Sequence, residues 1–132
     1  MSRFMLDTNT ISFFVRKHTL VKKRIVGEPM SSLCISAVTE GELLFGLARR
    51  PDAVRLAHAV QEFLRRVEVL AWDSSAAARY AICRADLEKT GQTLGTNDLL
   101  IGAHALSVNA TLITNDQAFK YLAELRLEDW TK

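Results

Sequence analysis

The chain has 132 residues, of which 48% are hydrophobic and 24% charged, with a formal net charge of +2. This balance suits one globular domain of ordinary size and excludes an intrinsically disordered chain. No apolar run approaches the ~20 residues that span a bilayer, and the three apolar residues between Arg3 and Asp7 are too few for a signal peptide.

Apolar runs and helical periodicities alternate along the chain. In chain order they predict a strand at residues 4–6, helices at 10–16 and 20–26, and a strand at 33–37. A helix capped by Ser36, a helix at 52–66 and a strand at 67–72 follow. Next come a long helix capped by Asp73 or Ser74 and ended by Gly91, an apolar helix capped by Thr96, a strand at 110–115 and a short edge strand at 125–130. Because the strands are continuous apolar runs, we predict an α/β fold with a parallel sheet covered on both faces.

Acidic side chains are predicted to meet at one edge of this sheet. Asp7 lies just past the first strand, Asp116 just past the fourth, and Asp98 in the first turn of the helix between. Glu40 or Glu42 lies in the helix after the second strand, and periodicity does not choose between them. In open α/β sheets, ligands bind outside the carboxyl ends of the strands.

Each acid also has a plainer interpretation as a helix-start residue favoured by the helix dipole. As a set, however, the acids would repel one another and raise their own pKa values, and a hard divalent cation would relieve that repulsion. Carboxylates without a histidine or cysteine cluster suit Mg²⁺, with Mn²⁺ as a substitute, rather than zinc. The three histidines lie on different predicted helices, and His104 is interpreted as a core histidine.

Four segments in register resemble a known family: "MLDTN", "SAVTEGEL", "TNDLLIGAHAL" and "LITND". They resemble the PIN-domain ribonucleases, and most of all the VapC toxins of bacterial toxin–antitoxin pairs, from Met5 to Trp130. The resemblance implies a PIN-like three-layer α/β/α sandwich with a central parallel sheet of four to five strands. We therefore expect a single PIN domain over residues 1–132, located in the cytoplasm and without a membrane partner.

The same resemblance implies a set of site residues. Those that would bind the metal and act in catalysis are Asp7, Glu42, Asp98 and Asp116. Glu42 is favoured over Glu40 because Ser36, Thr39 and Glu42 match the family's Ser-x-x-Thr-x-x-Glu pattern. Residues implied in a supporting role around the acids are Asn9, Thr39, Thr114 and Asn115.

The implied activity is metal-dependent endoribonuclease cleavage that leaves a 5′-phosphate and a 3′-hydroxyl. The expected substrate is tRNA, cut in the anticodon stem-loop, so that translation stops until a VapB-like antitoxin blocks the acid pocket. The family also implies a homodimer, which a larger toxin–antitoxin complex could contain. Basic residues that could hold the RNA backbone, or be ordinary solvated helix faces, are Arg16, Lys17, Lys22, Lys23, Arg24, Arg49 and Arg50.

Several alternatives are weighed against this interpretation. A phosphohydrolase of the HAD type needs a second acid two residues after the first, where this chain has Asn9. A degenerate PIN module that binds RNA or protein without cutting would have lost one or more acids, and all four are present. An antitoxin groove or a two-sided core could each explain the surplus of apolar residues at Phe13, Phe14, Leu43, Leu44, Phe45 and Leu47.

Overall fold

The computed structural model describes residues 3–132, and within them five strands form an all-parallel sheet. The strands are β1 (Phe4–Leu6), β2 (Leu33–Ser36), β3 (Glu68–Leu70), β4 (Thr111–Ile113) and β5 (Leu127–Glu128). Their order is β3-β2-β1-β4-β5, so β1 is the central strand and β5 lies at an edge. Met5 of β1 pairs with Cys34 on one side and with Leu112 on the other. The predicted parallel sheet, including its short edge strand, is confirmed.

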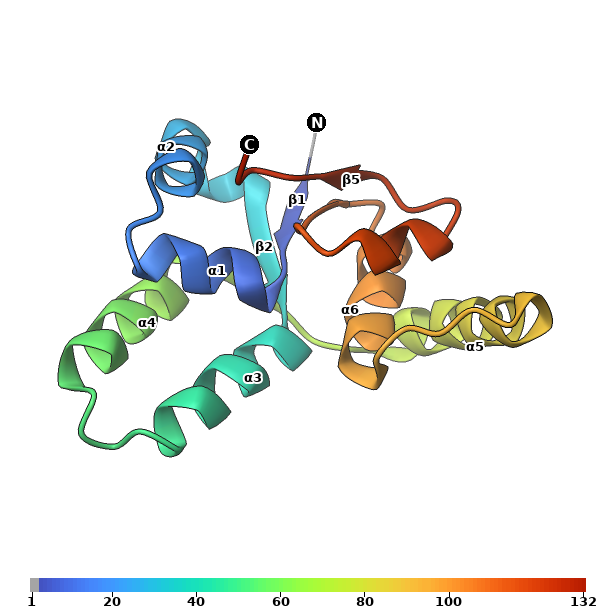
Figure 1. The fold of residues 1–132 in the computed structure, drawn as a ribbon, viewed down its shortest axis with the longest axis horizontal. Helices are drawn as coiled ribbons and strands as arrows, with labels where there is room; N and C mark the ends of the chain where they lie inside the picture. The colour runs from blue at the N-terminus through green and yellow to red at the C-terminus, as the bar shows by residue number, and fades with distance from the viewer. Residues whose placement is uncertain (1–2) are drawn as a thin grey trace.

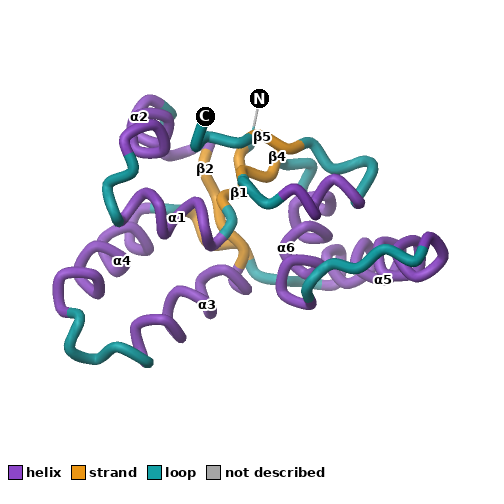
Figure 2. Tube along the Cα trace, viewed as in Figure 1, coloured by secondary structure: helices purple, strands orange, loops and turns teal. Residues whose placement is uncertain are grey.

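Helices cover both faces of the sheet (Figures 1 and 2). They are α1 (Thr8–Val15), α2 (Thr19–Gly27), α3 (Ala37–Ala48), α4 (Val54–Arg66), α5 (Ser74–Thr90) and α6 (Thr96–Ser107), with 3-10 turns η1 (Met30–Ser32) and η2 (Gln117–Tyr121). Helices α1, α2 and α4 lie on one side and α5 and α6 on the other, while α3 contacts both α1 and α6. The predicted three-layer sandwich is therefore confirmed. Among the described residues, none of the helices is both long and apolar enough to cross a membrane.

Alternate strand residues fill two separate cores. Met5, Cys34 and Leu112 pack in the core beneath α5 and α6. Their strand neighbours pack in the core beneath α1, α2 and α4; these are Leu6, Ile35 and Ile113. Because both faces of the sheet are covered, each strand is a continuous apolar run in the sequence.

The surplus apolar residues divide between the core and the surface. Leu43 is buried in the second core, and Phe13, Phe14 and Leu47 pack against it. Two residues of α3 remain exposed, Leu44 by 46% and Phe45 by 62%. The two-sided core thus explains most of the surplus, and α3 keeps an apolar outer surface.

Three helices begin one or two residues from their predicted starts: α1, α2 and α4 begin at Thr8, Thr19 and Val54 rather than at residues 10, 20 and 52. The predicted caps agree with the structure except at one position. Asp7, Ser36 and Asp73 cap α1, α3 and α5, because each side chain accepts a backbone N–H of the first turn. Gly91 ends α5 with φ of 68°, a left-handed conformation that glycine adopts without strain. The prediction that Thr96 caps the next helix is wrong: Gly95 is the N-cap, without a side-chain bond, and Thr96 is already the first residue of α6. Glycine is tolerated at an N-cap almost as well as threonine, so the local pattern did not separate the two.

Candidate active site

Asp7 is a buried acid at the junction of β1 and α1, only 4% exposed. Its Oδ1 accepts the backbone N–H of Thr10 at 2.8 Å, so the helix-cap interpretation is correct for one of its two oxygens. Burial raises the pKa of Asp7, hydrogen bonds from Thr114 and Thr10 oppose the rise, and the charge of Asp116 adds to it. A residue chosen only to cap a helix would not need this desolvated position, since caps function at the surface.

Asp98 shows that the predicted acids share one region of the molecule. It lies in the first turn of α6, half-buried. Its pKa is raised to about 6, chiefly by burial and then by repulsion from the other three predicted acids, Asp116, Asp7 and Glu42. Glu40 is not among the charges that act on it, which agrees with Glu42 as the member of the set.

Asp116 and Glu42 are held by hydrogen bonds to their own surroundings. Asp116 caps η2, with its Oδ1 accepting the backbone N–H of Ala118 at 2.9 Å. Glu42 accepts the Thr8 hydroxyl at Oε1 and the Asn97 amide, at 3.0 Å, at Oε2. Sequence reasoning missed Thr8 and Asn97, although each adjoins a predicted acid, because their partner lies 34 and 55 positions away.

The donor set fits a hard divalent ion, although it is not drawn together into a cage. Within residues 3–132, no three acidic, histidine or cysteine side chains converge closely enough to hold a metal. Protein sites for Mg²⁺ commonly use one or two carboxylates and keep several waters, so a closed cage is not required. Four mutually repelling carboxylates, two of them with raised pKa values, are the environment that such an ion would stabilise.

The supporting residues divide into two pairs. Thr114 is buried, accepts the backbone N–H of Asp116 at 3.0 Å and lowers the pKa of Asp7 by hydrogen bonding. Thr39 is buried on α3, and its hydroxyl has no partner among the described residues. Asn9 and Asn115 are exposed, and neither side chain takes part in the hydrogen bonds found between residues 3 and 132. Their supporting role stays a prediction.

A groove of about 240 Å³ lies between α1, α3 and α4, and Glu42 is the one member of the predicted acid set that lines it. Thr8 also lines it, and so do three of the predicted basic residues, Arg16, Arg49 and Arg50. The other four, Lys17, Lys22, Lys23 and Arg24, do not line it. Helix α2, which carries the last three of these, lies toward the end of the sheet where β1 begins (Figure 1).

Arg24 is already engaged elsewhere. It forms an ion pair with Glu128 at 3.3 Å, and its guanidinium lies over the Trp130 ring, 4.6 Å from the centroid. A cation held in this way has less freedom to follow a nucleic-acid backbone. Arg49 also lies over a ring, that of Phe45, at 5.1 Å from the centroid, but it lines the groove. Position beside Glu42 is therefore what favours the three groove arginines over the α2 cations for contact with a substrate.

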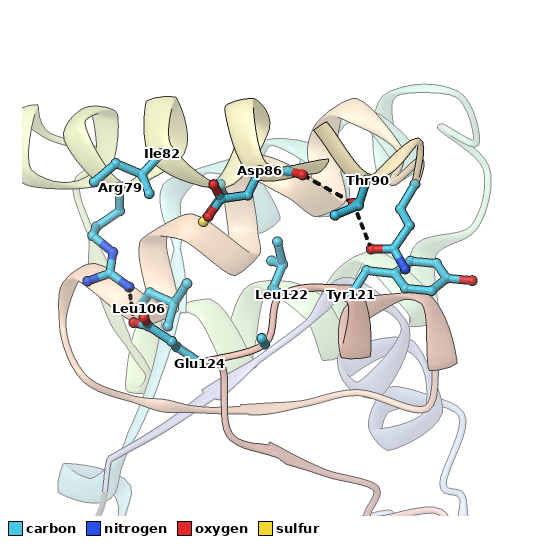
Figure 3. A pocket seen from close by; sticks show the side chains of 11 residues that line it. Arg79, Ile82, Asp86, Thr90, Leu106, Tyr121, Leu122 and Glu124 are labelled. Carbon is cyan, nitrogen blue, oxygen red and sulfur yellow. Dashed lines mark hydrogen bonds and ion pairs between the residues drawn. The ribbon is translucent and has the colours of Figure 1, made fainter. Parts of the chain in front are cut away.

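A larger pocket, of about 400 Å³, lies away from the acids (Figure 3). It is formed by α5, the end of α6 and the segment around η2, and none of the four acids lines it. Arg79 and Glu124 form an ion pair across it at 3.1 Å. The larger pocket and the cluster of acidic charge are therefore separate features, and the acids are the candidate site.

Known proteins resemble this chain over nearly its whole length. The model of the PIN domain family matches residues 4–125. The chain is 30% identical over 131 residues to ribonuclease VapC2 of Haemophilus influenzae, covering 98% of this chain and 99% of that one. It is 34% identical over 131 residues to the tRNA(fMet)-specific endonuclease VapC of Salmonella typhimurium, with coverage of 98% and 99%.

Solved structures that resemble this chain belong to the same group of proteins. The DNA-bound VapBC of Salmonella typhimurium matches with a TM-score of 0.91 and 34% identity, over 98% of this chain and 99% of that one. VapBC2 of Rickettsia felis, bound to a DNA fragment from its promoter, matches with a TM-score of 0.88 and 31% identity, over 96% and 98%. The phosphohydrolase alternative is wrong, and the chain belongs to the PIN-domain family and, within it, to the VapC ribonucleases.

Proposed function

We propose that this ribonuclease is a toxin that hydrolyses RNA phosphodiester bonds with Mg²⁺, which Mn²⁺ can replace. Its catalytic and metal-binding residues would be Asp7, Glu42, Asp98 and Asp116. The observation that carries the proposal is the meeting of these acids: the pKa of Asp98 is raised to about 6 by burial and then by the charges of all three others. Such a concentration of negative charge costs stability unless a cation serves it. RNA cleavage assays on Asp7→Asn and on the chain freed of divalent ions test it: activity equal to the wild type in either case would contradict the proposal.

The chain's own residues would hold the reacting groups in place. When bound, a divalent ion would supply Lewis-acid activation of water and neutralise charge on the phosphate. Asp7 is oriented by its bond from Thr10, and Glu42 by bonds from Thr8 and Asn97. Carboxylates fixed by neighbours in this way need no rearrangement before reaction, which is how preorganised sites lower a barrier.

The substrate we infer is tRNA, cleaved in the anticodon stem-loop, which would inhibit translation. Support comes from two relatives named tRNA(fMet)-specific endonuclease VapC, from Shigella flexneri and Salmonella typhimurium, at 32% and 34% identity. The test is end-mapping of cellular RNA after brief expression of the chain alone. Discrete cuts in one or a few tRNA anticodon loops are expected. General decay of mRNA would contradict the substrate, although not the nuclease chemistry.

Removing the groove arginines should weaken RNA binding more than catalysis. The variant Arg49→Ala/Arg50→Ala should raise KM about tenfold with kcat nearly unchanged, because phosphate contacts bind the ground state and the transition state alike. The slope of log affinity against log salt should also fall. Steady-state cleavage of a labelled tRNA at two salt concentrations measures both.

The matched control is Lys22→Ala/Lys23→Ala, which removes the same charge from α2, outside the groove. Its KM should stay within about twofold of the wild type, since a distant exposed charge is largely screened at physiological salt. An equal rise in KM for both variants would mean that net charge, rather than the groove, attracts the RNA.

The protein partner we infer is a VapB-like antitoxin that neutralises the toxin. Support comes from the VapBC complexes of Salmonella typhimurium and Rickettsia felis among the structural relatives. In this chain, the exposed Leu44 and Phe45 of α3 lie beside the groove that leads to Glu42. An apolar segment seated there would bring its flanking residues close to the acids.

Loss of this apolar surface should release the toxin from its antitoxin. Phe45→Glu should lower affinity for a VapB-like antitoxin by about 10- to 100-fold, a typical cost for a buried aromatic at an interface. Titration of the antitoxin into a cleavage assay measures it as a shift in the inhibiting concentration. Unchanged inhibition would show that the antitoxin binds elsewhere.

We also infer a homodimer, on the family resemblance. Its support in this chain is apolar exposure around the pocket of Figure 3, where Ile82 is 57% and Tyr121 40% exposed. Light scattering on the purified chain should give twice the protomer mass of 14.8 kDa. A mass of one protomer would contradict the dimer.

A further inference from the structure

His104 is a polar side chain in an otherwise apolar part of α6, and it is only 1% exposed. Its Nδ1 is hydrogen-bonded to the Oγ of Ser36 at 2.8 Å. Burial lowers the pKa of His104, so the ring is neutral at neutral pH despite the opposing charge of Asp73. The interpretation as a core histidine is thus correct for its burial, but its bond reaches a specific partner.

Ser36 occupies a structural junction. It is the last residue of β2 and the N-cap of α3, where its Oγ accepts the backbone N–H of Val38 at 3.1 Å. One hydroxyl therefore fixes the start of α3 and also binds α6 through His104. Helix α3 carries Glu42, and α6 carries Asp98.

A second bond links the first turn of α6 to the middle of α3. Asn97 of α6 donates to Glu42 of α3 at 3.0 Å. Ser36 and Glu42 are six positions apart, about 9 Å along a helix, and Asn97 and His104 are seven apart, about 10.5 Å. Because the numbering rises along α3 as it falls along α6, the helices run antiparallel and the two bonds match in spacing.

We propose that His104 is a positioning residue of the active site, whose bond to Ser36 sets the distance between α6 and α3 and so between Asp98 and Glu42. It touches neither RNA nor ion. The Asn97 bond fixes one point of contact between α6 and α3, and the buried bond fixes a second point. The inference rests on the proposed function, because it concerns the spacing of the proposed metal ligands.

The experiment measures Mn²⁺ binding to the full chain by electron paramagnetic resonance, alongside tRNA cleavage. His104→Leu keeps an apolar side chain of moderate size and removes the bond. Its Kd for Mn²⁺ should rise about 10-fold, the lower end of the cost of losing a direct partner of a metal ligand, because His104 acts through Ser36. The kcat should fall while KM for RNA stays unchanged. His104→Asn should restore most of the affinity, because its amide can reach the same hydroxyl.

The matched control is Ile101→Val, which trims a residue of α6 that is equally buried without touching the bond. It should keep the Kd for Mn²⁺ within about twofold of the wild type. Unchanged Mn²⁺ binding by folded His104→Leu, or an equal loss in Ile101→Val, would overturn the inference and leave the histidine as ordinary core.

A second route covers a failure of His104→Leu to fold. Ser36→Gly removes the hydroxyl partner and still caps α3 acceptably. The same rise in Kd is expected, and an unchanged Kd would overturn the inference. Absence of Mn²⁺ binding in the wild type would overturn the proposed function itself and the inference with it. Normal wild-type binding with unaffected variants would overturn only the inference.

Discussion

Replacing Asp7 with asparagine should reduce kcat for RNA cleavage by more than about 100-fold and leave the fold at least as stable as the wild type. Loss of a partner outside a metal's ligand shell costs 10- to 100-fold, so loss of a proposed ligand should cost more. Asparagine caps helices as well as aspartate and can still accept the Thr10 N–H. It also removes a charge that burial and Asp116 disfavour, as the raised pKa of Asp7 indicates.

The matched control is Asp73→Asn. Asp73 caps α5 by the same bond, its Oδ1 accepting the N–H of Ala76 at 3.1 Å, but it is exposed and is not one of the charges acting on Asp7 or Asp98. Its kcat should be that of the wild type. Single-turnover cleavage and urea unfolding on both variants separate the two roles of Asp7. Retained activity in Asp7→Asn, or an equal loss in Asp73→Asn, would refute the proposed role.

The strands could be predicted from the sequence because each one is marked by its own short apolar run. Continuous apolar runs predicted β1, β2 and β4, and the helix caps at Asp7, Ser36 and Asp73 follow from residue type. Ends were less certain where several residues fit equally well. The predicted strand at 67–72 is only Glu68–Leu70, and Gly95 rather than Thr96 is the N-cap of α6.

From the strand pattern alone, only the acids that directly follow a strand could be placed in the site. Asp7 and Asp116 follow β1 and β4, which are neighbours in the sheet, so topology brings them together. The choice of Glu42 over Glu40 depends on how α3 is rotated about its axis, and periodicity within α3 does not contain that angle. The resemblance to the family's Ser-x-x-Thr-x-x-Glu motif made the choice of Glu42.

Hydrogen bonds between segments far apart in the chain could not be predicted from the sequence. The bonds of Thr8 and Asn97 to Glu42 and of His104 to Ser36 join residues 34, 55 and 68 positions apart. Each joins two helices whose packing is set by the whole fold. Short polar residues beside an acid motif are a usable signal in retrospect, but that signal does not name the partner.

Removal of divalent ions should abolish cleavage completely, and added Mg²⁺ should restore it in a pH-dependent way. Without the ion, the pKa of Asp98 is about 6, against a usual value of 3.8. An ion that binds the carboxylate must displace this proton, so its affinity should be about tenfold weaker at pH 5 than at pH 7.5. Chelation followed by Mg²⁺ titration of tRNA cleavage at both pH values measures the shift.

The same pKa fixes the sign of the stability effect. A folded-state pKa above the unfolded one means that protonation of Asp98 stabilises the ion-free fold below about pH 4, and this stabilisation is lost as pH rises through 6. At pH 7.5 Mg²⁺ should take over the proton's role, contributing about 1.4 kcal/mol when it is at tenfold its Kd. At pH 5 the same Mg²⁺ concentration should raise the Tm much less.

Two variants make the origin of this effect testable. Asp98→Asn should raise the Tm of the ion-free chain at pH 7.5 and remove most of the response to Mg²⁺, since the repelled charge and a proposed ligand are both gone. Glu40→Gln removes an acid from the first turn of α3 that is not among the charges acting on Asp98, and it should respond to Mg²⁺ as the wild type does. Equal stabilisation by Mg²⁺ at pH 5 and pH 7.5 would place the ion away from Asp98. Cleavage that survives chelation would exclude the ion from the reaction, and the four acids would then need a different explanation for sharing one buried edge of the sheet.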